Sequence, residues 1–417
     1  MGKTIAYVIS ASAVFVSVAL YFWQSRQLPP KPSPPMFNQL VSHPSGTNGY
    51  EDFVRAVDFA NSSTAWQNYE NGPDNPPIAV KRMTLADAKL QTCLTALRAG
   101  LNKQATFIHK NPGIETLYPE MKDFRSLARL LILDMDVKWT SHKNSDAVKV
   151  LEDGLAFGRA VEVGPMVSGI VGLYIQNHFL WAFAKNFNQM DVQDCQKVQK
   201  IVGEHLMAPD LQISLINSER DTYLHSFQHY RSNPMGLLKQ LDPGPNAGAK
   251  EKTNFAEVCN MIVENPGVGP SIFDEAMKVL DKHNRLTIAE LKRPTWKRVY
   301  PGPEERTSPA AKLIYSLCQP SYSIIGNRFA AEQALVQIIG VHAAVIQFKL
   351  QNGHLPDNIE QLKLGRMAVD PFTGRQLSYQ RHKDENYEIK SEGPWDPGDS
   401  KRPPSGKRVP ISVPVHF

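Results

Sequence analysis

Apolar side chains recur at helical spacing over much of the chain between residues 49 and 232. Positions three and four residues apart share one face of an α-helix, so each such segment predicts a helix with one buried face. The positions are Tyr50, Phe53, Val54 and Val57 in one segment and Leu85, Ala88, Leu90, Cys93, Leu94, Leu97 and Leu101 in the next. The pattern predicts a mainly α-helical domain over residues 49–232.

Two more helices are predicted over residues 124–139 and 146–163, with a short polar turn between them. We expect Ser145 to be the N-cap of the second helix, because its hydroxyl can accept a backbone N–H of the first turn. The pair resembles a tetratricopeptide-like helix hairpin, but no 34-residue recurrence accompanies it to establish an array.

The segment 166–187 predicts another strong helix, rich in aliphatic and aromatic residues. At about twenty residues it is long enough to span a bilayer. Its polar residues Gln176, Asn177, His178 and Lys185 favour a buried central helix of the folded domain instead.

Residues 4–23 form an uncharged, mostly apolar run that ends in Tyr21, Phe22 and Trp23. Twenty helical residues span roughly 30 Å, the thickness of the hydrocarbon core, and the terminal aromatic residues fit the membrane interface. The alternative is a cleaved signal peptide, for which residues 11–13 offer a small-residue site. That site falls in the middle of the apolar run, so an uncleaved transmembrane helix in residues 1–23 is preferred.

The short N-terminal tail before this span fits a signal-anchor that translocates the rest of the chain. Arg26 and Lys31 follow the span while Lys3 and the α-amine precede it, so the charge bias is small. Residues 24–48 are rich in proline and predict an extended stalk. We therefore expect a single-pass protein of the bacterial inner membrane, with residues 24–417 in the periplasm.

Proline and glycine interrupt the next segment, residues 233–315, repeatedly. They predict a surface connector that carries one helix over residues 271–291. The run from Pro266 to Pro270 is not a phosphate-binding loop, since it lacks the lysine and hydroxyl residue that would hold phosphate and metal.

The last part of the chain, residues 316–417, predicts a small α+β module. Gly353 after Asn352 ends an apolar helix, and Pro356 keeps it from resuming. A turn at residues 370–374 then precedes two short strands, 376–380 and 387–390, that pair as a β-hairpin against the helix. The motifs in order are Asn352-Gly353-His354-Leu355-Pro356, Asp370-Pro371-Phe372-Thr373-Gly374 and Tyr387-Glu388-Ile389-Lys390-Ser391-Glu392-Gly393.

This order of motifs resembles the C-terminal globular part of type II secretion pseudopilins, and the tail of large membrane-anchored bacterial proteins that reuse the module. The resemblance covers about the last eighty-five residues and implies a fold rather than a chemistry. It also implies a calcium loop with Asp396 and Asp399 as oxygen donors and Asp370 as a further candidate. The favoured alternative is that these are turn aspartates, because calcium takes six to eight oxygen ligands.

The chain departs from pseudopilins at its other end. Its apolar segment contains no glutamate and no prepilin cleavage motif accompanies it, and more than 300 residues separate that segment from the tail. We therefore do not expect the chain to be processed and stacked into a pseudopilus.

Composition fits an ordinary folded ectodomain, with 42% hydrophobic and 21% charged residues. The net charge of +5 is too small and too dispersed to predict a nucleic-acid partner. The four cysteines form no CxxC pair, which argues against zinc or thioredoxin-like chemistry. Either two disulfides or buried free thiols fit Cys93, Cys195, Cys259 and Cys318.

One constellation offers chemistry. Asp221, His225 and His229 recur every fourth residue and would lie along one face of a helix, where two histidines and a carboxylate can bind zinc or another transition metal. No HExxH motif supplies a general base. The structural alternative, an ordinary ladder on a helix with aromatic neighbours, is favoured because paired histidines at this spacing are common by chance.

Three classes of function remain. The first is a non-enzymatic membrane-anchored protein that binds another envelope protein or the envelope itself. The second is an accessory component of a type II secretion or pilus-like system. The third is a metal-dependent hydrolase that uses Asp221, His225 and His229.

Overall fold

Helices account for most of the described chain, and a small antiparallel sheet follows them near the C-terminus, as the sequence predicted. The computed structural model describes residues 39–40, 46–73, 76–110, 113, 116, 118–208, 210–230, 233, 236, 252–253, 255–257, 259–260, 269–300, 308, 322–382, 386–395 and 407–413. The predicted transmembrane helix at residues 4–23 lies outside the described residues, as does almost all of the predicted stalk.

The predicted helices are confirmed, with ends that shift by a few residues. The helices are α2 (Gly49–Asn61), α3 (Thr64–Glu70), α4 (Ile78–Leu85), α5 (Ala88–Leu101), α6 (Glu120–Thr140), α7 (Asn144–Val161), α8 (Met166–Ala184), α9 (Val192–Met207), α10 (Gln212–Tyr230), α13 (Gly269–Leu291) and α15 (Tyr322–Asn352). Short 3₁₀ turns lie at Phe187–Gln189, Thr295–Lys297, Ile359–Leu362 and Gly365–Ala368. The helix expected over residues 85–101 starts only at Ala88, because the Asp87 carboxylate caps the N–H groups of Lys89 and Leu90.

The expected N-cap at Ser145 is wrong. Helix α7 begins at Asn144, and the Ser145 hydroxyl donates a hydrogen bond to Asp194 Oδ1 at 2.7 Å. His142 takes a left-handed backbone conformation (φ 56°), and Lys143 N–H then bonds back to the carbonyl of Lys138. This tight turn lets the second helix begin two residues earlier than the polar pattern predicted.

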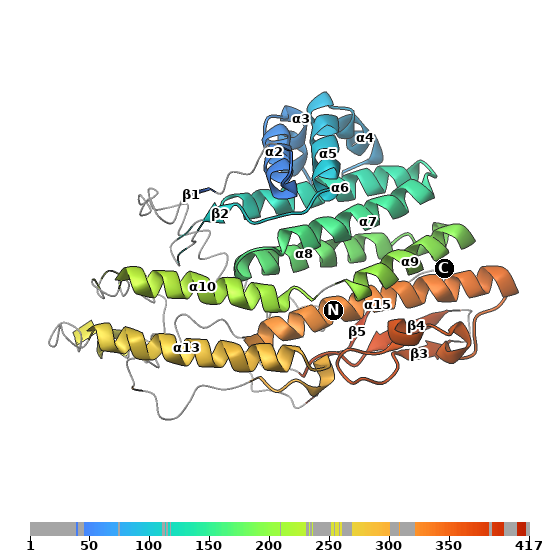
Figure 1. Ribbon diagram of the computed structural model, residues 1–417. Coiled ribbons are helices and arrows are strands. Elements are labelled where there is room, and N and C mark those ends of the chain that lie inside the picture. Colours follow the sequence, from blue (N-terminus) through green and yellow to red (C-terminus); the bar gives the residue numbers. More distant parts are fainter. Residues whose placement is uncertain are drawn as a thin grey trace.

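Helices α6, α7 and α8 lie side by side in layers, and α2–α5 cover one side of α6 (Figure 1). Helix α15 lies next to α8 and α9, while α13 runs along α10 (Figure 1). Helices α7 and α8 approach closely at Gly158 and Gly172, where a Cβ atom on Gly172 would lie 2.5 Å from the carbonyl oxygen of Gly158. Only glycine permits this contact.

One hydrophobic core runs from Tyr50 in α2 to Val413 after the last strand. Helix α15 joins the two parts, because it packs on α8 and α9 and also on the sheet. The helical domain and the C-terminal module, predicted as neighbours along the chain, therefore share one core. The predicted domain boundaries themselves stay a prediction.

The C-terminal module contains the predicted hairpin and one more strand. Gly353 has φ +76°, and its N–H bonds to the carbonyl of Lys349, which confirms the expected helix stop. The sheet order is β3 (Ser378–Arg381), β4 (Tyr387–Ser391) and β5 (Ile411–Ser412), all antiparallel. Strand β5 was not predicted, because two residues leave no readable alternation. Near the other end of the described chain, β1 (Gln39–Leu40) pairs with β2 (His109–Lys110).

Among the described residues, one helix is long and apolar enough to cross a membrane, the part of α15 at Ile324–Asn352. Its most apolar window is 83% buried inside the fold, so it is a core helix. Helix α8 is mostly buried as well, as its polar residues predicted.

Two of the four cysteines are buried free thiols. Burial raises the pKa of both Cys93 and Cys195 to about 12, so neither is a reactive thiolate at neutral pH. Cys318 lies outside the described residues.

Candidate functional site

Helix α10 carries the three residues of the predicted transition-metal site on successive turns. Asp221 is exposed and accepts a hydrogen bond from the guanidinium of Arg220 at 3.1 Å. The ring of His229 lies edge-on to Tyr230, and His225 is half-buried. In the part of the chain that the structure describes, no group of three or more His, Cys, Asp or Glu side chains is arranged to hold a metal ion. The transition-metal site stays a prediction.

Asp370 organises the turn of the C-terminal module. Its carboxylate accepts hydrogen bonds from Phe372 N–H at 2.9 Å, from the Ser391 hydroxyl at 2.9 Å and from Glu392 N–H at 2.8 Å. The side chain is buried, and these donors come from its own turn and from the end of β4. The Asp370 carboxylate therefore links the turn to the end of β4 through hydrogen bonds that occupy both of its oxygens. Asp396 and Asp399 lie outside the described residues, so the calcium loop stays a prediction.

A polar group that the sequence did not point to lies where α7, α8, α9 and α15 meet. We call Glu162, Gln176, His205 and Glu332 the buried acid cluster. Glu162 closes the C-terminus of α7 and accepts a hydrogen bond from the Gln176 amide in α8. His205 Nε2 in α9 lies 3.0 Å from Glu332 Oε1 in α15, and both side chains are buried. The cluster therefore links the helical body to the helix of the C-terminal module.

Electrostatics in the cluster favour a neutral Glu162. Burial raises the pKa of the Glu162 carboxyl well above its ordinary value, and the nearby charge of Glu332 raises it further. The Oε1 atom of Gln176 is buried without a hydrogen-bond partner. The buried acid cluster thus has more hydrogen-bond acceptors than donors. Such a site favours a proton on one of its carboxylates. It is too enclosed to present that proton to a substrate in this conformation.

A half-buried acid of α10 lies beside the start of α8. Glu219 in α10 accepts the N–H of Met166 at 2.8 Å, and burial raises the pKa of its carboxyl. A small cavity opens beside Met166, between α8, α10, α13 and α15. Its walls are mostly apolar, with Gln212 and two tyrosines as polar groups. The lining residues are Met166, Gln212, Leu215, Ile216, Leu291, Tyr300, Tyr322, Ile325, Gly326 and Phe329.

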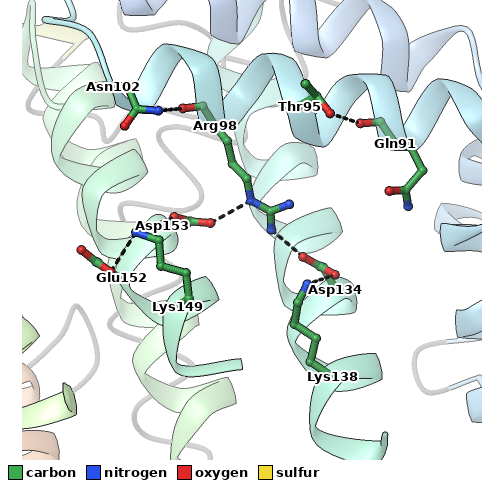
Figure 2. A network of polar contacts seen from close by, with 9 residues as sticks. All are labelled: Gln91, Thr95, Arg98, Asn102, Asp134, Lys138, Lys149, Glu152 and Asp153. Atoms are coloured by element: carbon green, nitrogen blue, oxygen red, sulfur yellow. Dashed lines mark hydrogen bonds and ion pairs between the residues drawn. The ribbon is translucent and has the colours of Figure 1, made fainter. Parts of the chain in front are cut away.

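A more exposed ionic network joins α5, α6 and α7 (Figure 2). The guanidinium of Arg98 reaches Asp134 at 2.6 Å and Asp153 at 2.9 Å, so one cation bridges two helices. Lys138 pairs with Asp134 as well, and Lys149 lies 3.6 Å from Asp153 (Figure 2). Each carboxylate therefore has two cationic neighbours, and the network ties three helices together from the surface.

No signal in the sequence marks the buried acid cluster. Its four residues come from four helices, and each looks like an ordinary polar position in its own segment. Only the close approach of α7 and α8 and the docking of α15 bring the side chains together.

Comparison with known proteins gives no relative from which a function can be carried over. No protein-family model, no curated protein and no solved structure matches the chain. The likeness of the C-terminal segment to pseudopilins therefore stays a prediction, based on its motifs.

Proposed function

We propose that this chain is a single-pass, membrane-anchored periplasmic protein that has an interaction role in the bacterial envelope. One observation carries the proposal. The apolar run at residues 4–23 is uncharged and long enough to span a bilayer, whereas the one membrane-length helix among the described residues is buried in the core.

The packing of α15 supports a folded ectodomain over a filament subunit. Helix α15 is covered by α8 and α9 on one side and by the C-terminal sheet on another. Nearly every residue from Ala330 to Ile346 is buried or half-buried. A helix that stacks into a filament needs an apolar face left for its neighbours. For this reason the accessory role in a secretion or pilus-like system is the weaker proposal.

The hydrolase proposal has less support from the described residues. Asp221 is already bound by Arg220, and the aromatic ring of Tyr230 lies against His229. Zinc analysis of the purified protein tests it directly. Zinc at one ion per chain that is lost in His225→Ala would revive the hydrolase, whereas a stable metal-free protein would end it.

The membrane anchor is tested with a charge placed in the middle of the apolar run. In Val14→Arg, a cation at the centre of the span costs about 2.5–3.5 kcal/mol of insertion free energy. We expect the wild-type chain to remain with membranes after alkaline carbonate extraction and a large share of Val14→Arg to be released. Val14→Leu keeps the apolar character and is the matched control.

The side of the membrane is tested by protease treatment. An external protease should digest the C-terminal module in spheroplasts and leave it intact in whole cells. A mature chain that is freely soluble and lacks its first two dozen residues would overturn the anchor, and protection of the module in spheroplasts would overturn the periplasmic location.

A further inference from the structure

One stripe of α8 remains at the surface although the helix is otherwise buried. We call Tyr174, His178, Trp181 and Lys185 the α8 outer stripe. The residues are four, three and four positions apart, so they share one face of the helix. Trp181 is 43% exposed, Lys185 is exposed, and the two other rings are half-buried. The stripe is thus an aromatic surface that ends in a cation.

The stripe is organised rather than a set of isolated side chains. The rings of Tyr174 and His178 stack at 5.5 Å between centroids, with 16° between their planes. The Arg125 guanidinium of α6 lies over the Tyr174 ring, 6.0 Å from its centroid. Such stacking holds the rings in place at low cost in side-chain entropy.

Positive charge surrounds this stripe. Burial lowers the pKa of His178, and the charges of Arg129 and Lys185 lower it further. Arg129 pairs with Glu70 at 2.6 Å, which neutralises part of its charge. Arg125 lies over the Tyr174 ring, and the exposed Lys185 ends the stripe with a further cation. An anionic partner therefore complements this surface.

We propose that the α8 outer stripe docks on the anionic lipid headgroups of the bilayer that holds the anchor. Tyrosine and tryptophan beside lysine and arginine are the residues that settle at a membrane–water interface, with the ring in the apolar boundary and the cation at the phosphates. This inference rests on the proposed membrane anchor.

The length of the tether permits the contact. Residues 24–38, which precede the paired strand β1, span at most roughly 45 Å in an extended polyproline conformation, and less when the chain folds back. A tether of this kind keeps the body at a high effective concentration near the bilayer, so that a weak surface contact suffices.

The test uses the full chain in vesicles whose acyl chains carry bromine, which quenches tryptophan fluorescence at short range. One vesicle type contains phosphatidylcholine alone, and the other also contains phosphatidylglycerol. The loss of quenching in Trp181→Phe relative to wild type reports on Trp181. Trp296→Phe is the matched control, because Trp296 is 42% exposed on a different element.

We expect Trp181 to be quenched in phosphatidylglycerol vesicles and not in phosphatidylcholine vesicles, and Trp296 in neither. Lys185→Gln should lower the docked-to-undocked ratio by roughly fivefold, which is the equivalent of about 1 kcal/mol per cation near an anionic surface. High salt should release Trp181 as well.

Four results would overturn the proposal. Equal quenching of Trp181 and Trp296 would mean that the stripe has no preference for the bilayer. An emission shift of Trp181 with poly-glutamate, without quenching by phosphatidylglycerol vesicles, would assign the stripe to an acidic polypeptide. A chain that does not float with vesicles at all would remove the anchor, and the docking proposal with it; a chain that floats with Trp181 unquenched would remove the docking proposal alone.

Discussion

Helix α15 helps to bury ionisable groups on two of its sides, and these groups are stabilised in different ways on each side. Toward the sheet, the fully buried His342 has both ring nitrogens in hydrogen bonds, to Tyr387 Oη at 3.0 Å and to the carbonyl oxygen of Val413 at 3.2 Å. Toward α7 and α9, Glu332 pairs with His205 and lies close enough to Glu162 to raise its pKa.

The partners decide which charge state each side holds. A carbonyl can only accept, so His342 Nε2 carries the ring proton and Nδ1 accepts the hydroxyl proton of Tyr387. That imidazole is neutral and fully satisfied. Burial beside a second acid favours the neutral form of Glu162, because the charged form would be desolvated next to another carboxylate. Acid should therefore disturb the sheet side, whereas alkali should disturb the side of the buried acid cluster.

The largest effect is expected at His342. Burial lowers the pKa of His342 to about 3 in the folded protein, against about 6.5 in the unfolded chain. A folded pKa below the unfolded value means that stability falls as pH drops below about 6.5. At a pH near 4 the loss should reach about 3 kcal/mol, from roughly 2.5 units at 1.36 kcal/mol each.

His342→Gln tests this loss by urea unfolding at several pH values. The variant should be less stable than wild type at neutral pH, because glutamine cannot reproduce both hydrogen bonds. Its free energy of unfolding should then change less between neutral pH and pH 4. Parallel profiles for the two proteins would mean that His342 is not the acid-sensitive group.

The second effect is expected at Glu162, with the opposite pH dependence. A folded pKa above the unfolded value gives stability that is fully present below about pH 4 and declines as pH rises toward the folded pKa. The slope is at most about 1.4 kcal/mol per pH unit for one group. Glu162→Gln keeps the shape without the ionisation, so its stability over wild type should grow as pH rises.

The measurement is again the free energy of unfolding, now from pH 4 to pH 8. Glu204→Gln is a suitable control, since Glu204 is an exposed glutamate of α9 whose variant should follow the wild-type profile. If Glu162→Gln is destabilising by the same amount at every pH, then Glu162 serves as an ionised hydrogen-bond acceptor and the comparison of the two sides of α15 fails.

Local patterns were enough to predict most helices and the hairpin, because these depend on spacing and on turn residues. Gly353 and Asp370 both act at the turns where the sequence placed them. Ser145 was misassigned because a polar residue before an apolar run fits both a cap and a first helical turn. The structure decides between them through His142, whose backbone conformation no residue pattern indicates.

The surroundings of His342 and Glu332 on α15 could not be predicted from local patterns, because their partners come from distant parts of the chain. His342 is a lone histidine in the sequence, and the structure gives it two hydrogen-bond partners in the core. Those partners come from β4 and from beyond β5, a strand too short to predict. Glu162 and Glu332 meet only through the packing of four helices, so their shared chemistry had no signature along the chain.

The smallest effect should come from the ionic network of Arg98, which extends the comparison to charges near the surface. Arg98 is 37% exposed, so water screens its pairs with Asp134 and Asp153. Arg98→Met removes the cation but leaves Lys138 beside Asp134 and Lys149 beside Asp153 (Figure 2). The loss should therefore be about 1 kcal/mol and should shrink at high salt.

Arg55→Met is the matched control for this network, because Arg55 pairs with a buried aspartate, Asp52, that Lys103 also contacts at 2.5 Å. Both variants leave each carboxylate with one cation, so both should cost little in urea unfolding. A loss of 3 kcal/mol or more in Arg98→Met alone would match the range for breaking a buried pair. In that case the exposed fraction of the arginine would be a poor guide to its contribution. An ion pair would then have to be classed as interior or surface by the burial of its carboxylate, and not by the exposure of its arginine.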